Sequence, residues 1–472
     1  MFSRSMNSKH MKKIIFLFIS SLAISFTVDA NDIGQENKKK IDTLQKELNQ
    51  LKQNLKKQEH LNLEEKSNEG IYKNVTFSGD IKIFAFSEHN PVFRAGKTSD
   101  WMENIGHLKA STLLEGGHKA TIRLAAISTV GDDIDSYGPR SGEDEKIIAD
   151  ELNIHLKDIF DQSLDVKVGR QSFKLGTGFL VSDGYFDSIT RFNGTLSHFD
   201  GISSLYKIND HFQFESYWFR VDNNFVQFSE AVFPYTGGGH ILGGELTCKN
   251  KKWGKWSVGT LKRHDQSDLK NETIVTYLRG NKDLVKDLNI NFEIVHQSGK
   301  TRMNGGLPDP VETNSYRRNS WGGFVSIKKQ FSEITYKPWL QTQYVHYGGD
   351  KQSTSKNEGF DPLFFSWIPW GHGAINNTNT IIQKYTVGLS PTPQLSIAAD
   401  WWNYHWDHRR PGYSNKHYAT LTAVNMNYSL SENVFTGAFL GYLDPHEAGT
   451  KYFGPMNDRT IRIVGAWVVT TF

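Results

Sequence analysis

The chain has almost no cysteine, little net charge and few long apolar runs. Its 472 residues include one cysteine, Cys248, and the formal net charge is +3. A single cysteine excludes an intramolecular disulfide, so hydrogen bonding or a packed core must stabilise the fold. The only long apolar run is near the N-terminus, and the mean hydropathy is -0.51. Because a membrane-spanning helix needs about 20 mainly apolar residues, the sequence excludes a helical membrane protein.

Aromatic residues and glycine are abundant by contrast. The chain has 30 Phe, 18 Tyr, 12 Trp and 41 Gly against 13 Pro, which is typical of a β-rich protein. Basic and acidic residues nearly balance, with 54 against 51. No overall charge therefore favours nucleic acid as a partner.

Residues 1–30 have the pattern of a secretory signal peptide. A basic segment precedes an apolar stretch from Ile14 to Phe26, and Val28-Asp29-Ala30 comes before the expected cleavage point. The alternative, a permanent membrane anchor, would need a longer apolar stretch. Residues 1–30 hold four basic residues and one acidic residue, so the rest of the chain is formally neutral.

From Val75 onward the hydrophobic pattern changes to a period of two. In the clearest run, six alternate residues share one face: Tyr418, Thr420, Thr422, Val424, Met426 and Tyr428. Elsewhere charged residues alternate with apolar ones, as in a transmembrane barrel whose lumen is wet and whose outer face is apolar. A soluble all-β protein is the alternative, because its strands also have one wet face.

About eighteen such runs follow one another, and single-chain bacterial barrels have an even number of strands. Short turns such as Gly116-Gly117-His118 alternate with long polar segments such as 131–146. Only the extracellular loops of an outer-membrane barrel are free to grow, so residues 71–472 are predicted to form a transmembrane antiparallel β-barrel. The runs begin near Val75, Asn104, Lys119, Ile147, Ser163, Asp200, Phe212, His240, Gly254, Asn271, Leu288, Asn319, Thr335, Asn379, Gln394, Lys416, Asn433 and Arg459.

Residues 31–70 are predicted to form a short coiled-coil stalk in the periplasm. Apolar residues recur at alternating steps of three and four and form a seam, and polar residues fill the positions between them. The helix can therefore bury this seam only against copies of itself. A homotrimer is expected because large barrels are often trimeric. The alternative is a solvated amphipathic helix that rests on the barrel mouth. The seam residues are Ile41, Leu44, Leu48, Leu51 and Leu55.

Three short motifs resemble the barrel of the alginate export family. They are Val168-Gly169-Arg170-Gln171, Phe199-Asp200-Gly201 and GFDPLFFSWIPWG over residues 359–371. The resemblance covers roughly Val75 to Phe472 and implies an outer-membrane barrel of about eighteen strands. An aromatic residue such as Phe472 after a final alternating run is a further feature of Gram-negative outer-membrane barrels. The predicted stalk resembles instead the coiled coil of trimeric porins selective for phosphate or dicarboxylates.

The residues predicted to line the pore carry both signs of charge, whereas focusing a polyanion needs one sign to dominate the wall. We therefore expect a passive channel for small hydrophilic or oligosaccharide-like solutes. The alternatives are an alginate-type export pore and an adhesion or structural barrel. The pore-lining candidates are Asp80, Lys82, Arg123, Glu151, Lys157, Lys167, Glu245, Glu293, Lys337, Lys384 and Asp400.

Two segments, 172–198 and 348–378, are longer than ordinary connectors. A barrel of this diameter leaves an open lumen unless a loop folds inward, so we predict that one of them constricts the pore. Aromatic residues in a constriction either stack on sugar rings or pack against the barrel wall. The constriction candidates are Arg170, Phe360, Asp361, Phe364, Trp367 and Trp370.

No motif in the sequence indicates an enzyme, a cofactor or a metal site. Nucleophile-elbow and HExxH spacings are absent. His405 and His408 would point to opposite faces of a strand. The expected surroundings are outer-membrane lipid and lipopolysaccharide, with a small hydrophilic solute as the ligand.

Deleting Asn31 to Glu69 tests the predicted stalk. We expect the deleted protein to migrate as a smaller species than the full chain on native gels, because the only self-complementary apolar seam is gone. An unchanged oligomer would remove the role assigned to this segment.

Overall fold

The computed structural model describes residues 74–90, 96, 98–131, 143–161, 163–181, 199–221, 239–265, 272–301, 303–304, 307–308, 316–351, 355–361, 363, 378–409, 412–453 and 459–472. The chain divides into two compact units, Met1–Thr76 and Phe77–Phe472. The predicted signal peptide and stalk lie outside the described residues. Within those residues, no helix has the length and apolar character that a membrane crossing requires.

Eighteen long strands make up most of the second unit, and each pairs antiparallel with its neighbours. They are β1 (Val75–His89), β2 (Thr98–Leu113), β3 (Lys119–Gly131), β4 (Glu143–Leu156), β5 (Leu164–Gln171), β6 (Phe199–Lys207), β7 (Phe212–Val221), β8 (Gly239–Asn250), β9 (Gly254–Asp265), β10 (Glu272–Val285), β11 (Leu288–Thr301), β14 (Tyr316–Gln330), β15 (Trp339–Tyr347), β17 (Thr380–Leu389), β18 (Leu395–Trp406), β19 (His417–Ser429), β20 (Val434–Pro445) and β21 (Ile461–Thr471).

The smaller described elements lie in the connections between these strands. The two-residue strand β16 pairs parallel with β14 and is the nineteenth member of the sheet. Strands β12 and β13 form a separate hairpin. The bounds are β12 (Met303–Asn304), β13 (Leu307–Pro308), β16 (Lys356–Asn357), the 3₁₀ turns η3 (Glu115–Gly117) and η4 (Ile159–Asp161), and the helix α4 (Glu447–Phe453).

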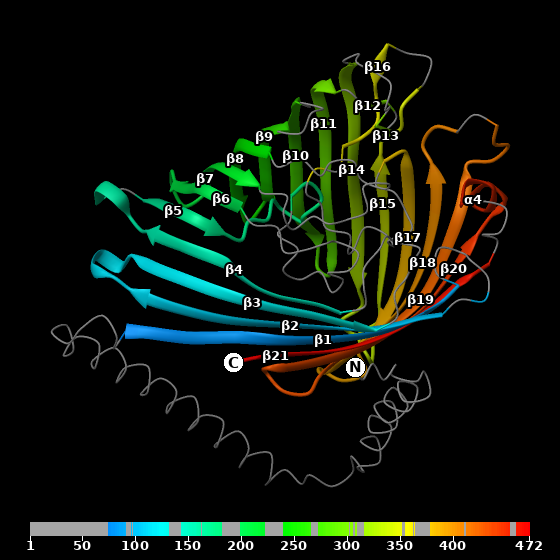
Figure 1. Ribbon diagram of the computed structural model, residues 1–472, viewed down its shortest axis with the longest axis horizontal. Coiled ribbons are helices and arrows are strands. Elements are labelled where there is room, and N and C mark those ends of the chain that lie inside the picture. The colour runs from blue at the N-terminus through cyan, green and yellow to red at the C-terminus, as the bar shows by residue number, and fades with distance from the viewer. Residues whose placement is uncertain are drawn as a thin grey trace, which may run out of the picture. The chain divides into compact units, whose positions relative to one another are not determined.

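The sheet closes into a barrel because its first and last strands pair with each other. Strands β1 and β21 run side by side in Figure 1, in a register that extends from Asp80 opposite Thr471 to His89 opposite Arg462. The seam continues to Gly79, whose N–H and carbonyl bond the backbone of Phe472 at 2.9 and 3.0 Å. A closed ring has no edge strand with unpaired backbone groups, which is what a β-structure needs in order to span lipid.

The predicted antiparallel barrel of about eighteen strands is confirmed. The largest differences are at three strand starts: β2 begins at Thr98 rather than near Asn104, β4 at Glu143 rather than near Ile147, and β15 at Trp339 rather than near Thr335. The first six residues of β2 were missed because Glu103 occupies a buried, inward position that an apolar residue usually fills.

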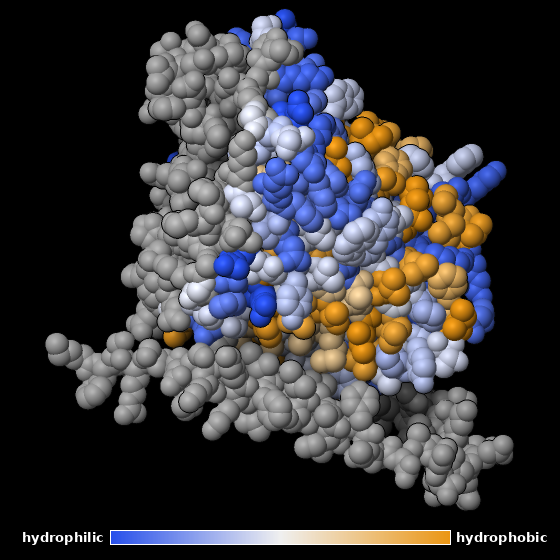
Figure 2. All heavy atoms as spheres, turned by 90° about the vertical axis from the view of Figure 1, so that its right-hand side faces the viewer, coloured by the Kyte–Doolittle hydropathy of each residue, from blue (hydrophilic) through white to orange (hydrophobic). Residues whose placement is uncertain are grey.

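Alternate side chains of the strands form an apolar outer surface. On three neighbouring strands, Leu246, Val258 and Leu278 are cross-strand partners and stay 37%, 51% and 39% exposed. Figure 2 shows the face made by the strands on the right of Figure 1, where hydrophobic side chains gather in a band below a more hydrophilic zone. This arrangement is that of a barrel whose outer band faces hydrocarbon.

The two ends of the barrel differ in the length of their connections. Strands β10 and β11 are joined by Lys286 and Asp287 alone, and β8 and β9 by residues 251–253. The opposite end carries the segments 172–198 after β5 and 348–379 after β15. This asymmetry matches the predicted alternation of short turns and long loops.

Replacing Val258 with arginine tests which face meets lipid. We expect the free energy of unfolding from bilayers to fall by about 2–4 kcal/mol, the usual cost of a lipid-facing charge near the bilayer midplane. Urea titration in phospholipid vesicles measures the change. Lys262→Arg, on the same outer face but near the long-loop end, serves as the control. Equal stability of V258R and the wild type would contradict this orientation.

Candidate functional site in the barrel interior

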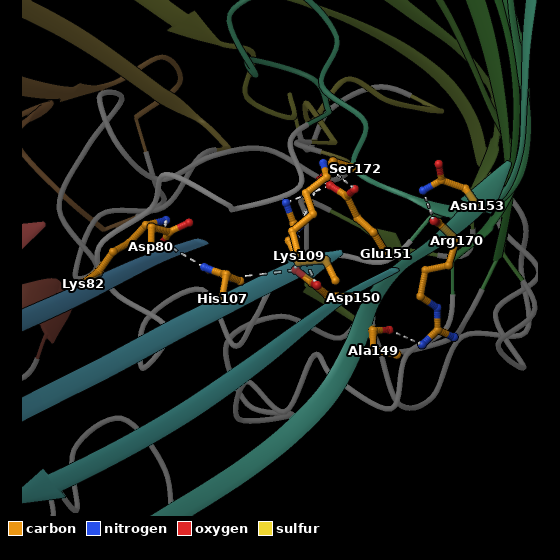
Figure 3. Close-up of polar contacts among 11 residues, drawn as sticks. Asp80, Lys82, His107, Lys109, Ala149, Asp150, Glu151, Asn153, Arg170 and Ser172 are labelled. Atoms are coloured by element: carbon orange, nitrogen blue, oxygen red, sulfur yellow. Dashed lines mark hydrogen bonds and ion pairs between the residues drawn. The ribbon is translucent and has the colours of Figure 1, made fainter. Parts of the chain in front are cut away.

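A chain of ionisable side chains crosses the inner wall of strands β1 to β4, as Figure 3 shows. We call it the charge ladder. Six of its seven members are buried, and they come from strands that are paired in register, so the barrel itself sets their spacing. The ladder consists of Asp80, Lys82, His107, Lys109, Arg123, Asp150 and Glu151.

His107 links the two ends of the ladder. Its Nδ1 lies 2.9 Å from Oδ1 of Asp80, and its Nε2 lies 3.8 Å from Oδ2 of Asp150. On the far side of Asp80, the ammonium group of Lys82 approaches Oδ1 to 3.7 Å. The imidazole ring therefore lies between two carboxylates contributed by different strands.

Arg123 faces two successive acidic residues because β4 contains a bulge. The register between β3 and β4 shifts so that Arg123 opposes Glu151 while Leu124 opposes Ala149, which leaves Asp150 as the extra residue. Both carboxylates consequently point inward. The Nε atom of Arg123 donates to both oxygens of Asp150 at 2.9 and 2.8 Å, and Nη1 lies 2.7 Å from Oε1 of Glu151.

Lys109 is the accessible end of the ladder. Its Nζ donates to Oε2 of Glu151 at 3.1 Å, yet its side chain remains 32% exposed. The hydroxyl of Ser172, just after β5, donates to Oε1 of Glu151 at 3.2 Å. The start of the long segment after β5 is thus attached to the ladder.

Similar pairs of opposite charge occur farther around the wall. Lys384 on β17 lies 3.4 Å from Asp400 on β18 and 4.3 Å from the ring centre of Trp402. Arg279 on β10 is in contact with Glu245 on β8, and it is the cross-strand partner of Glu293 on β11. Acidic and basic groups are therefore close neighbours on both sides of the lumen.

Two segments between strands fold into the barrel and pack against each other. Phe179 belongs to the segment after β5, and its ring stacks on Tyr347 at the end of β15 with centroids 5.1 Å apart. The same ring lies 5.8 Å from Phe360, in the segment after β15. A Cβ atom at Gly322 would collide with the Phe360 ring, so glycine is needed where this aromatic meets the wall. The described parts of both segments thus narrow the interior.

Asp361 anchors the second of these segments to four adjacent strands. Its carboxylate accepts from Nη1 of Arg263 at 3.1 Å and lies 3.7 Å from Nη2 of Arg318. The hydroxyl of Thr273 also donates to it, at 3.3 Å. Gln297 bonds both the N–H and the carbonyl of Asp361, at 2.8 and 2.7 Å. The anchor therefore combines charge neutralisation with satisfied backbone groups.

Ionisation of Asp361 persists despite its burial. Burial by itself raises the pKa of this carboxyl, but Arg263 and Arg318, helped by the Leu363 N–H, hold the pKa below its ordinary value. A lowered native pKa means that the contribution to stability is fully present above the unfolded-state value. It is lost only as the pH falls through the lowered native value.

The structure places most pore-lining candidates on the inner wall. Asp80, Lys82, Arg123 and Glu151 belong to the ladder, and Lys384 and Asp400 form a pair. Glu245 and Glu293 are buried beside Arg279, and Lys167 is half-buried on β5.

Two of the pore-lining candidates are not on the inner wall. Lys157 and Lys337 are exposed in connections outside the strands, where the alternation rule does not apply. Lys337 has a positive φ of 42°, as a tight turn requires. The structure therefore removes both from the predicted lining.

Among the constriction candidates, Phe360 and Asp361 are buried in the interior, and Phe360 packs against the wall rather than presenting a free face. Arg170 is not in the lumen. It is the cross-strand partner of Leu152, which is 57% exposed on the outer face, and it forms a bidentate pair with Asp200 at 2.7 and 2.8 Å. Phe364, Trp367 and Trp370 lie outside the described residues.

Several charged residues of the interior escaped the sequence analysis. His107, Lys109 and Ser111 occupy every second position of β2 and so share its inner face. Applying the period of two to the whole strand would have identified the first two. Asp150 was missed because a bulge breaks the alternation. Arg263 and Arg318 are far from Asp361 along the chain, and no local pattern connects them.

No group of three or more histidine, cysteine or acidic residues is arranged to hold a metal ion in the part of the chain that the structure describes. His405 stacks on His417 with ring centroids 4.4 Å apart, whereas His408 lies 3.6 Å from Asp407. These rings thus have separate partners.

Comparison with known proteins reveals a likeness of fold. No family model and no curated protein matches the chain. The BenF-like porin from Pseudomonas fluorescens Pf-5 has a TM-score of 0.55 at 11% identity, covering 85% of this chain and 100% of that chain. Acinetobacter baumannii OccAB1 has a TM-score of 0.55 at 8% identity, covering 86% and 98%. Pseudomonas aeruginosa OccK2 (OpdF), solved in complex with glucuronate, has a TM-score of 0.54 at 10% identity, covering 86% and 99%.

At these identities the comparison establishes the architecture, an 18-strand barrel of the kind found in outer-membrane porins. The motif resemblance to the alginate export family is not supported by any of these structures.

The substitution Asp361→Asn tests the anchor. We expect a loss of about 3–5 kcal/mol in the free energy of unfolding, because two buried guanidinium groups lose their counter-charge. Amide hydrogen exchange over residues 355–361 should also speed up. Lys351→Gln, an exposed change on the same segment, is the control. Unchanged exchange in D361N would show that packing alone holds the segment.

Proposed function

We propose that this chain forms a passive outer-membrane channel for small hydrophilic or oligosaccharide-like solutes. A closed barrel of this strand number encloses a lumen wide enough to conduct, and its wall here is polar at the level of the charge ladder. The inward segments held by Asp361 and packed around Phe179 reduce the width of that lumen. Narrowing of this kind suits small solutes rather than folded macromolecules.

The pairing of opposite charges on the inner wall carries this proposal. We give the name lumen belt to thirteen charged residues of the described wall, those of the ladder apart from His107 together with the charges that continue it around the barrel. It has six basic and seven acidic members, so neither sign dominates the wall: Lys82, Lys109, Arg123, Lys167, Arg279, Lys384, Asp80, Asp150, Glu151, Glu215, Glu245, Glu293 and Asp400. A wall with both signs gives weak ion selectivity.

Export of an anionic polysaccharide is a weaker candidate. Its support is the motif that contains Arg170, but that side chain is paired with Asp200 on the outer face and contributes nothing to the lumen. A polyanion would also meet the acidic half of the belt. The proposed periplasmic stalk and homotrimer are separate predictions, and conduction does not depend on them.

Planar-bilayer recording of the purified protein tests the proposal. We expect discrete conductance steps and a reversal potential close to zero in a tenfold KCl gradient, against about 59 mV for a fully selective pore. Absence of steps would favour an adhesion or structural barrel, and strong anion preference would favour polyanion export.

A matched pair of variants tests whether the charges of the lumen belt set the ion selectivity. Lys384→Gln removes a basic group of the belt and should shift the reversal potential toward cation preference. Lys157→Gln removes the same charge from an exposed connection and should leave the potential unchanged. Equal shifts in K384Q and K157Q would show that the belt does not set selectivity.

A further inference from the structure

We propose that the lumen belt favours small zwitterions, such as amino acids, over solutes of one charge sign and over uncharged solutes of equal size. This inference rests on the proposed channel function and specifies its substrate class. It comes from the order and accessibility of the charges around the wall rather than from their total.

Groups of both signs are spread along the belt on at least seven strands. Lys167 on β5 continues the ladder, because it interacts electrostatically with Glu151 on one side and Glu215 on the other. Glu215 on β7 is in turn close to Glu245 and Arg279. From β1 to β10 the wall therefore offers groups of both signs with no long stretch of one sign, although Glu215 directly faces Glu245 and Lys109 faces Arg123.

On strands β1 to β7, three members of the belt remain reachable by a solute. Lys109 is 32% exposed at its side chain, and Lys167 and Glu215 are half-buried. The other ladder members are buried in ion pairs, as Arg123 is with Asp150. The accessible set thus contains two ammonium groups and one carboxylate on the same side of the barrel.

This arrangement discriminates by charge distribution. An anion attracted to Lys167 is repelled by the neighbouring carboxylates, and it must lose part of its hydration shell to approach the lysine. A zwitterion can place its carboxylate near a lysine and its ammonium group near Glu215. Lys167 on β5 and Glu215 on β7 are separated by β6, with the same register offset by which Arg279 on β10 reaches across β9 to contact Glu245 on β8. Because strands are about 4.8 Å apart, long side chains bring such groups to distances that a small zwitterion can span. Two partial ion pairs then offset the desolvation that each charge suffers.

Glycine and glycolamide provide the test, because they are isomers with the same atoms and differ in charge distribution. Proteoliposomes containing the full chain are placed in isosmotic glycine or glycolamide, and the initial swelling rates are compared. We expect glycine to enter about three times faster, the effect of one modest ion-pair contact. A glycine-to-glycolamide ratio of one or below would overturn the proposal.

Substitutions in the accessible set identify the groups responsible. Lys167→Gln and Glu215→Gln should each bring the ratio toward one without slowing glycolamide, whereas Lys167→Arg keeps the charge and should keep the ratio. Lys252→Gln, in the exposed turn between β8 and β9, is the control. A wild-type ratio retained in both K167Q and E215Q would refute the role of the belt.

The outcome also separates this inference from the channel itself. If neither solute enters faster than in protein-free liposomes, the proposed channel function fails and the inference fails with it. If both enter at equal rates, the channel function stands and only the preference for zwitterions is wrong.

Discussion

Closure of the backbone hydrogen-bond ring is the constraint on which the rest of the structure depends. Because β1 pairs with β21, every long strand has two neighbours, and no edge is left to pair with another chain. Closure also gives each strand an inner and an outer face. The apolar outer surface around Val258 and the charged inner wall around Arg123 are both consequences of that geometry.

The interior combines two kinds of packing with different consequences. Charged groups such as Arg123 and Asp150 pair across strands, so the wall can be polar without leaving these buried charges unbalanced. Aromatic residues such as Phe179 and Phe360 fill space with segments that come from the long-loop end. In the proposed channel, the first kind would set which solutes the wall attracts, and the second would set the width left for them.

Much of the architecture was accessible from the sequence. The period-two pattern predicted the barrel and its strand number, and lumen-facing residues such as Lys384 and Asp400 followed from the same alternation. The rule failed where the backbone leaves regular geometry. Lys337 is in a turn, Asp150 is in a bulge, and the prediction that Arg170 constricts the pore followed a motif resemblance rather than the alternation of β5.

The sequence by itself determined the number of strands, the faces of most of their side chains and the alternation of short and long connections, because these depend on neighbours along the chain. The tertiary structure decided which charges meet. Asp361 finds Arg263 and Arg318, and Lys109 finds Glu151, only after the barrel has closed with its strands in register. Pairing between distant segments depends on register and bulges, and one residue of shift moves a side chain to the opposite face.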